Sequence, residues 1–70
     1  MKINFSQLFI VQNGMISPKV QIHLNGVTMS PGLSFGGGVS FGGIDLSQYI
    51  GKDFDVIIEN EIYYIKGIFN

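Results

Sequence analysis

The sequence has no cysteine, tryptophan, alanine or arginine among its 70 residues. Without cysteine no disulfide can form, and a single histidine, His23, leaves too few ligands for a structural zinc ion. A single domain of residues 1–70 is close to the smallest size that is stable alone, and this one has neither a disulfide nor a structural zinc ion to stabilise it. We therefore expect a homo-oligomer.

Charge is also scarce. Charged residues make up 13% of the chain and hydrophobic residues 46%, whereas a soluble domain has about a quarter charged. Four lysines and a net charge of −1 exclude the basic footprint of a nucleic-acid-binding protein. The longest aliphatic and aromatic run, Leu8 to Val11, is far shorter than the roughly 20 residues of a membrane span. The sequence predicts a cytoplasmic protein without cofactor, metal, nucleic acid or membrane contact.

What remains favours β-structure, since Ile, Val, Phe and Tyr prefer strands and alanine is missing. Asn13-Gly14 and Asn25-Gly26 are signals for two-residue type I′ hairpin turns, and Asn60-Glu61 divides a third pair of apolar runs. In the second hairpin, His23 is expected opposite Thr28. We predict a mainly β fold, a small antiparallel sheet or barrel-like domain built from hairpins, with one short helical turn near residues 45–51.

The third hairpin is predicted to pair Ile58 with Tyr63 and Asp55 with Lys66, because opposed charges favour this register. One face then consists of Phe54, Val56, Ile58, Tyr63, Ile65 and Phe69. The opposite face is still too apolar for open water, and it is our predicted oligomer interface: Ile57, Ile62, Tyr64 and Ile68.

The predicted helical turn starts at Asp45 as N-cap and stops at Gly51. It should direct three apolar side chains to one side: Leu46, Tyr49 and Ile50. Pro18 is expected at a strand end or bulge, and Pro31-Gly32 in a turn.

The stretch Leu33–Gly43, LSFGGGVSFGG, repeats itself and permits three interpretations. It could be a hairpin around a glycine loop that pairs Phe35 with Val39, or a flap whose phenylalanines dock on a protein partner. It could also be a cradle of main-chain N–H groups for a small anion, assisted by Lys19 or Lys52. The candidate binding residues are Phe35, Gly36, Gly37, Gly38 and Phe41.

No catalytic pattern is found. The serines lack a G-x-S-x-G elbow, and the three aspartates are interpreted as cap, turn and cross-strand residues: Asp45, Asp53 and Asp55. Charge is uneven, since residues 1–44 hold two lysines and no acid, whereas residues 45–70 hold five acids and two lysines. We expect the basic part of one subunit to face the acidic part of another.

These features predict a non-enzymatic, homo-oligomeric protein that acts by occupying a protein partner. In size and composition it is similar in type to small inhibitor proteins of phages and mobile elements, although no motif carries this likeness. Two alternatives stay open: a protein that sequesters a small, nucleotide-like anion with the glycine segment, and a structural subunit that assembles through strand edges.

Overall fold

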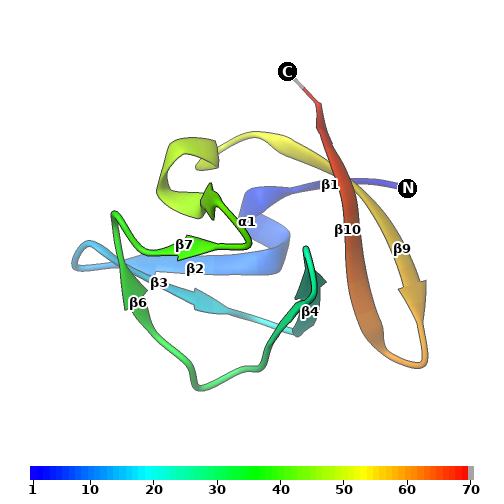
Figure 1. Ribbon diagram of the computed structural model, residues 1–70, viewed down its shortest axis with the longest axis horizontal. Helices are drawn as coiled ribbons and strands as arrows, with labels where there is room; N and C mark the ends of the chain where they lie inside the picture. The colour runs from blue at the N-terminus through cyan, green and yellow to red at the C-terminus, as the bar shows by residue number, and fades with distance from the viewer. Residues whose placement is uncertain (70) are drawn as a thin grey trace.

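A computed structural model describes residues 1–69 and shows a mainly β fold, as predicted (Figure 1). Five strands form one sheet in the order β1-β9-β10-β4-β5, three form a second in the order β2-β3-β6, and β7 pairs with β8. The elements are β1 Lys2–Asn4, α1 Phe5–Leu8, β2 Phe9–Gln12, β3 Met15–Pro18, β4 Gln21–Leu24, β5 Val27–Met29, β6 Phe35–Gly36, β7 Ser40–Phe41, β8 Ile44–Asp45, the 3-10 turn η1 Leu46–Tyr49, β9 Asp53–Glu59 and β10 Ile62–Phe69.

The three predicted two-residue turns are confirmed. Asn13, Asn25 and Asn60 all have left-handed backbone angles, with φ of 53°, 47° and 52°, as a type I′ turn requires at its first central position. The second hairpin has the predicted pairs, Ile22–Met29, His23–Thr28 and Leu24–Val27. Local turn chemistry therefore fixes the register of the strands on either side.

In the hairpin β9–β10 the predicted register holds only as far as Ile65. Ile58 opposes Tyr63 and Val56 opposes Ile65, but a bulge at Lys66 then places Gly67 opposite Asp55. The Asp55–Lys66 pair is therefore wrong. An extra residue in one strand reverses the faces beyond it. Ile68 consequently opposes buried Phe54 and packs against the core, while Phe69 is exposed.

The large sheet combines distant parts of the chain. Strand β10 pairs in parallel with β4, from Ile62 opposite Gln21 to Tyr64 opposite His23. Strand β1 pairs antiparallel with β9, and Ile3 lies opposite Phe54. The third hairpin is thereby inserted between the first strand and the second hairpin, which gives a mixed sheet where an antiparallel one was expected.

The core collects aromatic and aliphatic side chains from both larger sheets. The Phe5 ring stacks on that of Phe9 with centroids 4.7 Å apart, and it lies 6.2 Å from Phe54. The buried core residues are Phe5, Leu8, Phe9, Ile16, Ile22, Leu24, Met29, Phe35, Leu46, Phe54, Val56 and Ile65.

Two helical turns insert residues into this core. The predicted turn η1 is confirmed, with Asp45 as N-cap and Leu46 buried, but Ile50 points outward and is 50% exposed. The turn α1 was not predicted. Asn4 caps it by accepting a hydrogen bond from the Ser6 N–H at 3.0 Å, an Asx-type signal that sequence reasoning missed.

The two proline predictions are confirmed. Pro18 is the last residue of β3, and Pro31-Gly32 forms a turn in which the Leu33 N–H donates to the Ser30 carbonyl at 3.2 Å. Gly32 has φ of 100°, which suits the third position of a type II turn.

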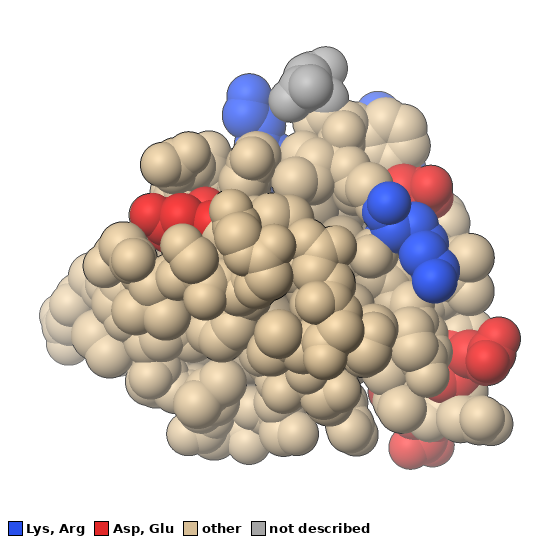
Figure 2. Space-filling view, viewed as in Figure 1, with Lys and Arg blue, Asp and Glu red and all other residues tan. Residues whose placement is uncertain are grey.

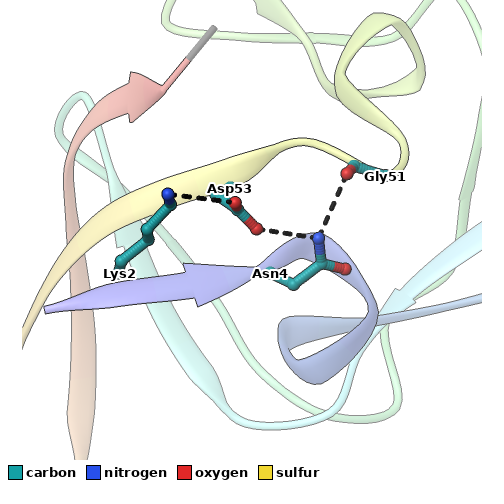
Figure 3. A network of polar contacts seen from close by, with 4 residues as sticks. All are labelled: Lys2, Asn4, Gly51 and Asp53. Carbon is teal, nitrogen blue, oxygen red and sulfur yellow. Dashed lines mark hydrogen bonds and ion pairs between the residues drawn. The ribbon is translucent and has the colours of Figure 1, made fainter.

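The uneven charge is partly neutralised within the chain. Figure 2 shows the basic and acidic groups above and to the right, over the β9–β10 side, and beside η1. In Figure 3, Lys2 of β1 lies 3.7 Å from the Asp53 carboxylate of β9, and the Asn4 amide donates to Asp53 at 2.8 Å and to the Gly51 carbonyl at 3.1 Å. The first lysine therefore already faces an acid of its own subunit, and the expected contact between the basic and acidic parts of different subunits stays a prediction.

Candidate functional site

The glycine-rich segment does not form the predicted hairpin. Phe35 and Gly36 add to β3, with Phe35 opposite Ile16, while Phe41 of β7 opposes Ile44 of β8. The pairing of Phe35 with Val39 is therefore wrong, because two separate partners outcompete it. The Phe35 and Phe41 rings still meet edge to face, with centroids 4.6 Å apart.

This placement turns the phenylalanines inward. Phe35 is 7% exposed and belongs to the core, and Phe41 packs against the core. Neither ring projects as the docking interpretation requires. The segment nevertheless stays at the surface through its glycines, since Gly37 and Gly38 are exposed.

The loop around Gly38 does bind an anionic group, the carboxylate of Asp45. The Gly38 N–H donates to Asp45 Oδ2 at 3.2 Å, while the Ser47 hydroxyl and N–H donate to Oδ1 at 2.7 and 3.0 Å. These hydrogen bonds, chiefly those from Ser47, lower the pKa of Asp45. One donor of the predicted anion cradle is thus already used within the protein.

The second glycine group makes a turn and a close contact. Gly42 and Gly43 connect β7 to β8 with φ of 58° and 87°. A Cβ atom on Gly42 would overlap the Asn25 side chain and lie 3.0 Å from the Asn25 carbonyl oxygen. The Asn25 amide donates to the Gly42 carbonyl at 3.3 Å. Gly42 is therefore needed where this turn meets the β4–β5 turn.

The distal end of the hairpin β9–β10 is apolar on both faces. Ile57 and Ile58 are adjacent and point to opposite faces, yet they are 49% and 41% exposed. Ile57 opposes Tyr64, and Ile58 opposes Tyr63. We call these four residues the hairpin tip. In Figure 1 the hairpin lies along the right-hand side of the molecule.

Open hollows flank the hairpin tip on both faces. The larger, about 540 Å³, lies on the Tyr63 side and reaches Val20 and Pro31, with Asn60 and Glu61 at its rim. A smaller one, about 190 Å³, has Ile57 and Tyr64 as its apolar part and Glu59 and Lys66 as its charged part. Both combine an apolar surface with polar groups at the edge.

The predicted oligomer interface is only partly assembled. Ile57, Ile62 and Tyr64 share the outer face of the hairpin, but the bulge turns Ile68 to the core. Polar neighbours accompany them: the Lys66 ammonium lies 5.4 Å from the Tyr64 ring centroid, and the His23 ring lies 5.2 Å from it. The role of this face in self-association stays a prediction.

A second group of exposed apolar side chains was missed by sequence reasoning. Sheet β2-β3-β6 and the segments next to it expose five large hydrophobic side chains: Ile10, Val11, Met15, Leu33 and Val39. The sequence does contain an indication of these exposed apolar residues, because no charged residue occurs between Lys2 and Lys19 or between Lys19 and Asp45. In Figure 2 the surface over these strands is correspondingly uncharged.

Residues 1–69 contain no cluster of three or more metal-ligating side chains and no helix long enough to cross a bilayer. The sequence and the fold were also compared with protein-family models, with curated proteins and with solved structures. None of these comparisons finds a significant match.

Proposed function

We propose that the protein is a non-enzymatic binding protein whose hairpin tip is the contact surface for another protein. The observation that carries this proposal is the half-exposure of Ile57 and Ile58 on opposite faces of one strand. A hairpin at the surface of a free-standing domain is normally polar on at least one face. Covering both isoleucines would remove this exposed apolar surface from water.

The chemistry of the tip suits a protein partner. Tyr63 and Tyr64 are of a residue type that is enriched at the energetic centre of interfaces, because a large apolar ring also carries a hydroxyl. Glu59 and Lys66 surround the apolar centre on one face, as the polar rim of an interface does. Such a protein would act by occupying its partner, in the cytoplasm of the producing or host cell, as an inhibitor of phage or mobile-element type does.

Sequestration of a small anion is the less supported candidate. It requires free main-chain donors in the glycine segment, but Gly38 donates to Asp45. The carboxylate would have to leave before a phosphate could use this N–H group, and its charge would repel the incoming anion.

The proposal is tested with an aspartate in the tip and a matched control. Ile57→Asp places a charge at the centre of the proposed contact, whereas Ile50→Asp does the same at an equally exposed isoleucine beside η1. Wild-type protein and both variants are immobilised and exposed to extract of the organism that makes the protein. We expect one retained protein that binds the wild type and Ile50→Asp and is lost with Ile57→Asp.

The proposal is wrong if all three forms retain the same proteins. It is equally wrong if a retained protein is lost with Ile50→Asp and kept with Ile57→Asp. Circular dichroism of both variants establishes that they remain folded.

A further inference from the structure

We propose that strand β2 is a self-association edge, to which a second copy of the chain adds its own β2 in antiparallel orientation. The two three-stranded sheets would join into one six-stranded sheet across a twofold axis. This inference concerns a surface other than the hairpin tip and does not depend on the partner-binding function.

The main-chain hydrogen bonds show which groups of β2 are free. Pairs that exchange hydrogen bonds alternate with pairs that do not. In the β2–β3 hairpin the first hydrogen-bonded pair is Gln12–Met15, which flanks the two-residue turn, and every second pair after it is also hydrogen-bonded. The bond of 2.8 Å from the Lys19 N–H to the Leu8 carbonyl fits this alternation. The N–H and C=O groups of Val11 therefore point away from β3, where residues 1–69 provide no further strand.

Phe9 shares this orientation but is not open to a neighbour. Its N–H donates to the Phe5 carbonyl as the cap of α1, and the whole residue is buried in the core. Val11 is thus the position at which a new strand can both donate and accept a hydrogen bond.

Strand β2 is also the least protected edge. Proteins block exposed edges with charge, proline, bulges or very short strands. Strand β1 carries Lys2, strands β6, β7 and β8 have two residues each, and β5 has three and is soon followed by Pro31. Strand β2 has four residues in a regular ladder with none of these features, and Ile10 and Val11 are each 46% exposed.

A second copy is the occupant that this edge fits. Twofold pairing places each residue opposite itself or a close neighbour, so a charged strand would repel its own copy. Phe9–Gln12 is uncharged, and the nearest charged residues along the chain are Lys2 and Lys19. With Val11 opposite Val11 of the second copy, two reciprocal hydrogen bonds form, and Ile10 then lies opposite Gln12 of the second copy in a non-bonded pair.

The first experiment compares Val11→Lys with the matched variant Ile57→Lys in sedimentation equilibrium at micromolar concentration. The two positions have nearly equal exposure, but only Val11 lies at the proposed edge. We expect a dimeric wild type, a dimeric Ile57→Lys and a Val11→Lys form whose dissociation constant is raised by about tenfold or more, because two like charges meet across the axis.

The inference is overturned by a monomeric wild type or by a Val11→Lys form as dimeric as the wild type. It is also overturned if Ile57→Lys dissociates the protein and Val11→Lys does not, which would return self-association to the outer face of the hairpin. Partner capture by the hairpin tip is measured separately, so the two proposals can fail independently.

The second experiment does not require a destabilising charge and tests the register. The chain has no cysteine of its own, so Ile10→Cys and Gln12→Cys each introduce one thiol at an exposed site. Non-bonded antiparallel pairs bring Cα atoms to about 4.5 Å, within the range of a disulfide. After subunit exchange and mild oxidation, we expect an equimolar mixture to form disulfide-linked heterodimers faster than either variant alone forms homodimers. Equal rates in the mixture and in the separate samples would overturn the proposed pairing.

Discussion

At the scale of single residues, Asp45 holds the exposed glycine segment in place. Its carboxylate accepts hydrogen bonds from Ser47 and from Gly38. The same residue therefore caps η1 and holds the loop that follows β6. This side chain therefore connects the start of η1 to the loop between β6 and β7, beside the pairing of Ser40 with Asp45.

The lowered pKa of Asp45 predicts a pH dependence of stability. Because the folded pKa lies below the ordinary value of an aspartate, the carboxylate stabilises the fold above that ordinary value, and this contribution is lost as the pH falls through the folded pKa. Asp45→Asn removes the titrating group. We expect the difference in urea midpoint between wild type and Asp45→Asn to be largest near pH 6 and to shrink in acid; a constant difference would contradict the assignment.

Gly42 and Gly43 provide a matched pair for the close contact between turns. Both have positive φ, which costs about 1–2 kcal/mol for an L side chain, but only a Cβ on Gly42 meets Asn25. We expect Gly42→Ala to lower the free energy of unfolding by at least about 1 kcal/mol more than Gly43→Ala does. Urea denaturation measures both, and equal losses would show that the two turns do not touch.

At the scale of elements, the bulge in β10 is the feature with the clearest consequence. Lys66 is the extra residue, so removing it would leave Gly67 opposite Asp55 and Ile68 opposite Phe54. We expect deletion of Lys66 to be tolerated better than deletion of Tyr64, which would shift every later residue to the other face. Thermal unfolding of the two deletion variants checks this, and a Lys66 deletion that fails to fold would contradict it.

The contrast between predicted and observed elements follows the range of the interactions. The three asparagine turns and the cap at Asp45 depend on a few adjacent residues, and the sequence predicts them correctly. The bulge at Lys66 and the addition of Phe35 to β3 depend on distant strands and on how well competing pairs fill the core. The residue pattern of one segment does not show which of several possible strand pairings is the most stable.

The candidate surfaces show the same division. Ile57 and Tyr64 are correctly placed on the outer face, because alternation defines a face over a few residues of a strand. Ile68 lies beyond the bulge and is misplaced, and Phe35 is buried because a strand from elsewhere receives it. The β2 edge was missed because exposure of an edge depends on which strands remain unpaired after the whole sheet is assembled.

At the scale of the whole molecule, the large sheet couples opposite parts of the chain. Met1 and Val56, which are 55 positions apart, bond to each other through their main chains, and β10 joins β4 in parallel. Strands that pair across such large sequence separations must first be brought together, and the entropy of closing the intervening chain is lost before their contacts can stabilise the pair.

Strands β9 and β10 are synthesised last, so the large sheet can be completed only at the end of synthesis. Residues 2–29 emerge from the ribosome first and contain three of the five strands of the large sheet, yet β1 has no partner and β4 is paired only with β5 until about thirty further residues follow. At about 5–20 residues per second, the nascent chain displays the uncharged strand β2 for seconds while no complete sheet exists to bury its neighbours. Neighbouring nascent chains on one polysome would therefore meet through this strand before either has folded, and the cell's holding chaperones would be expected to bind there first.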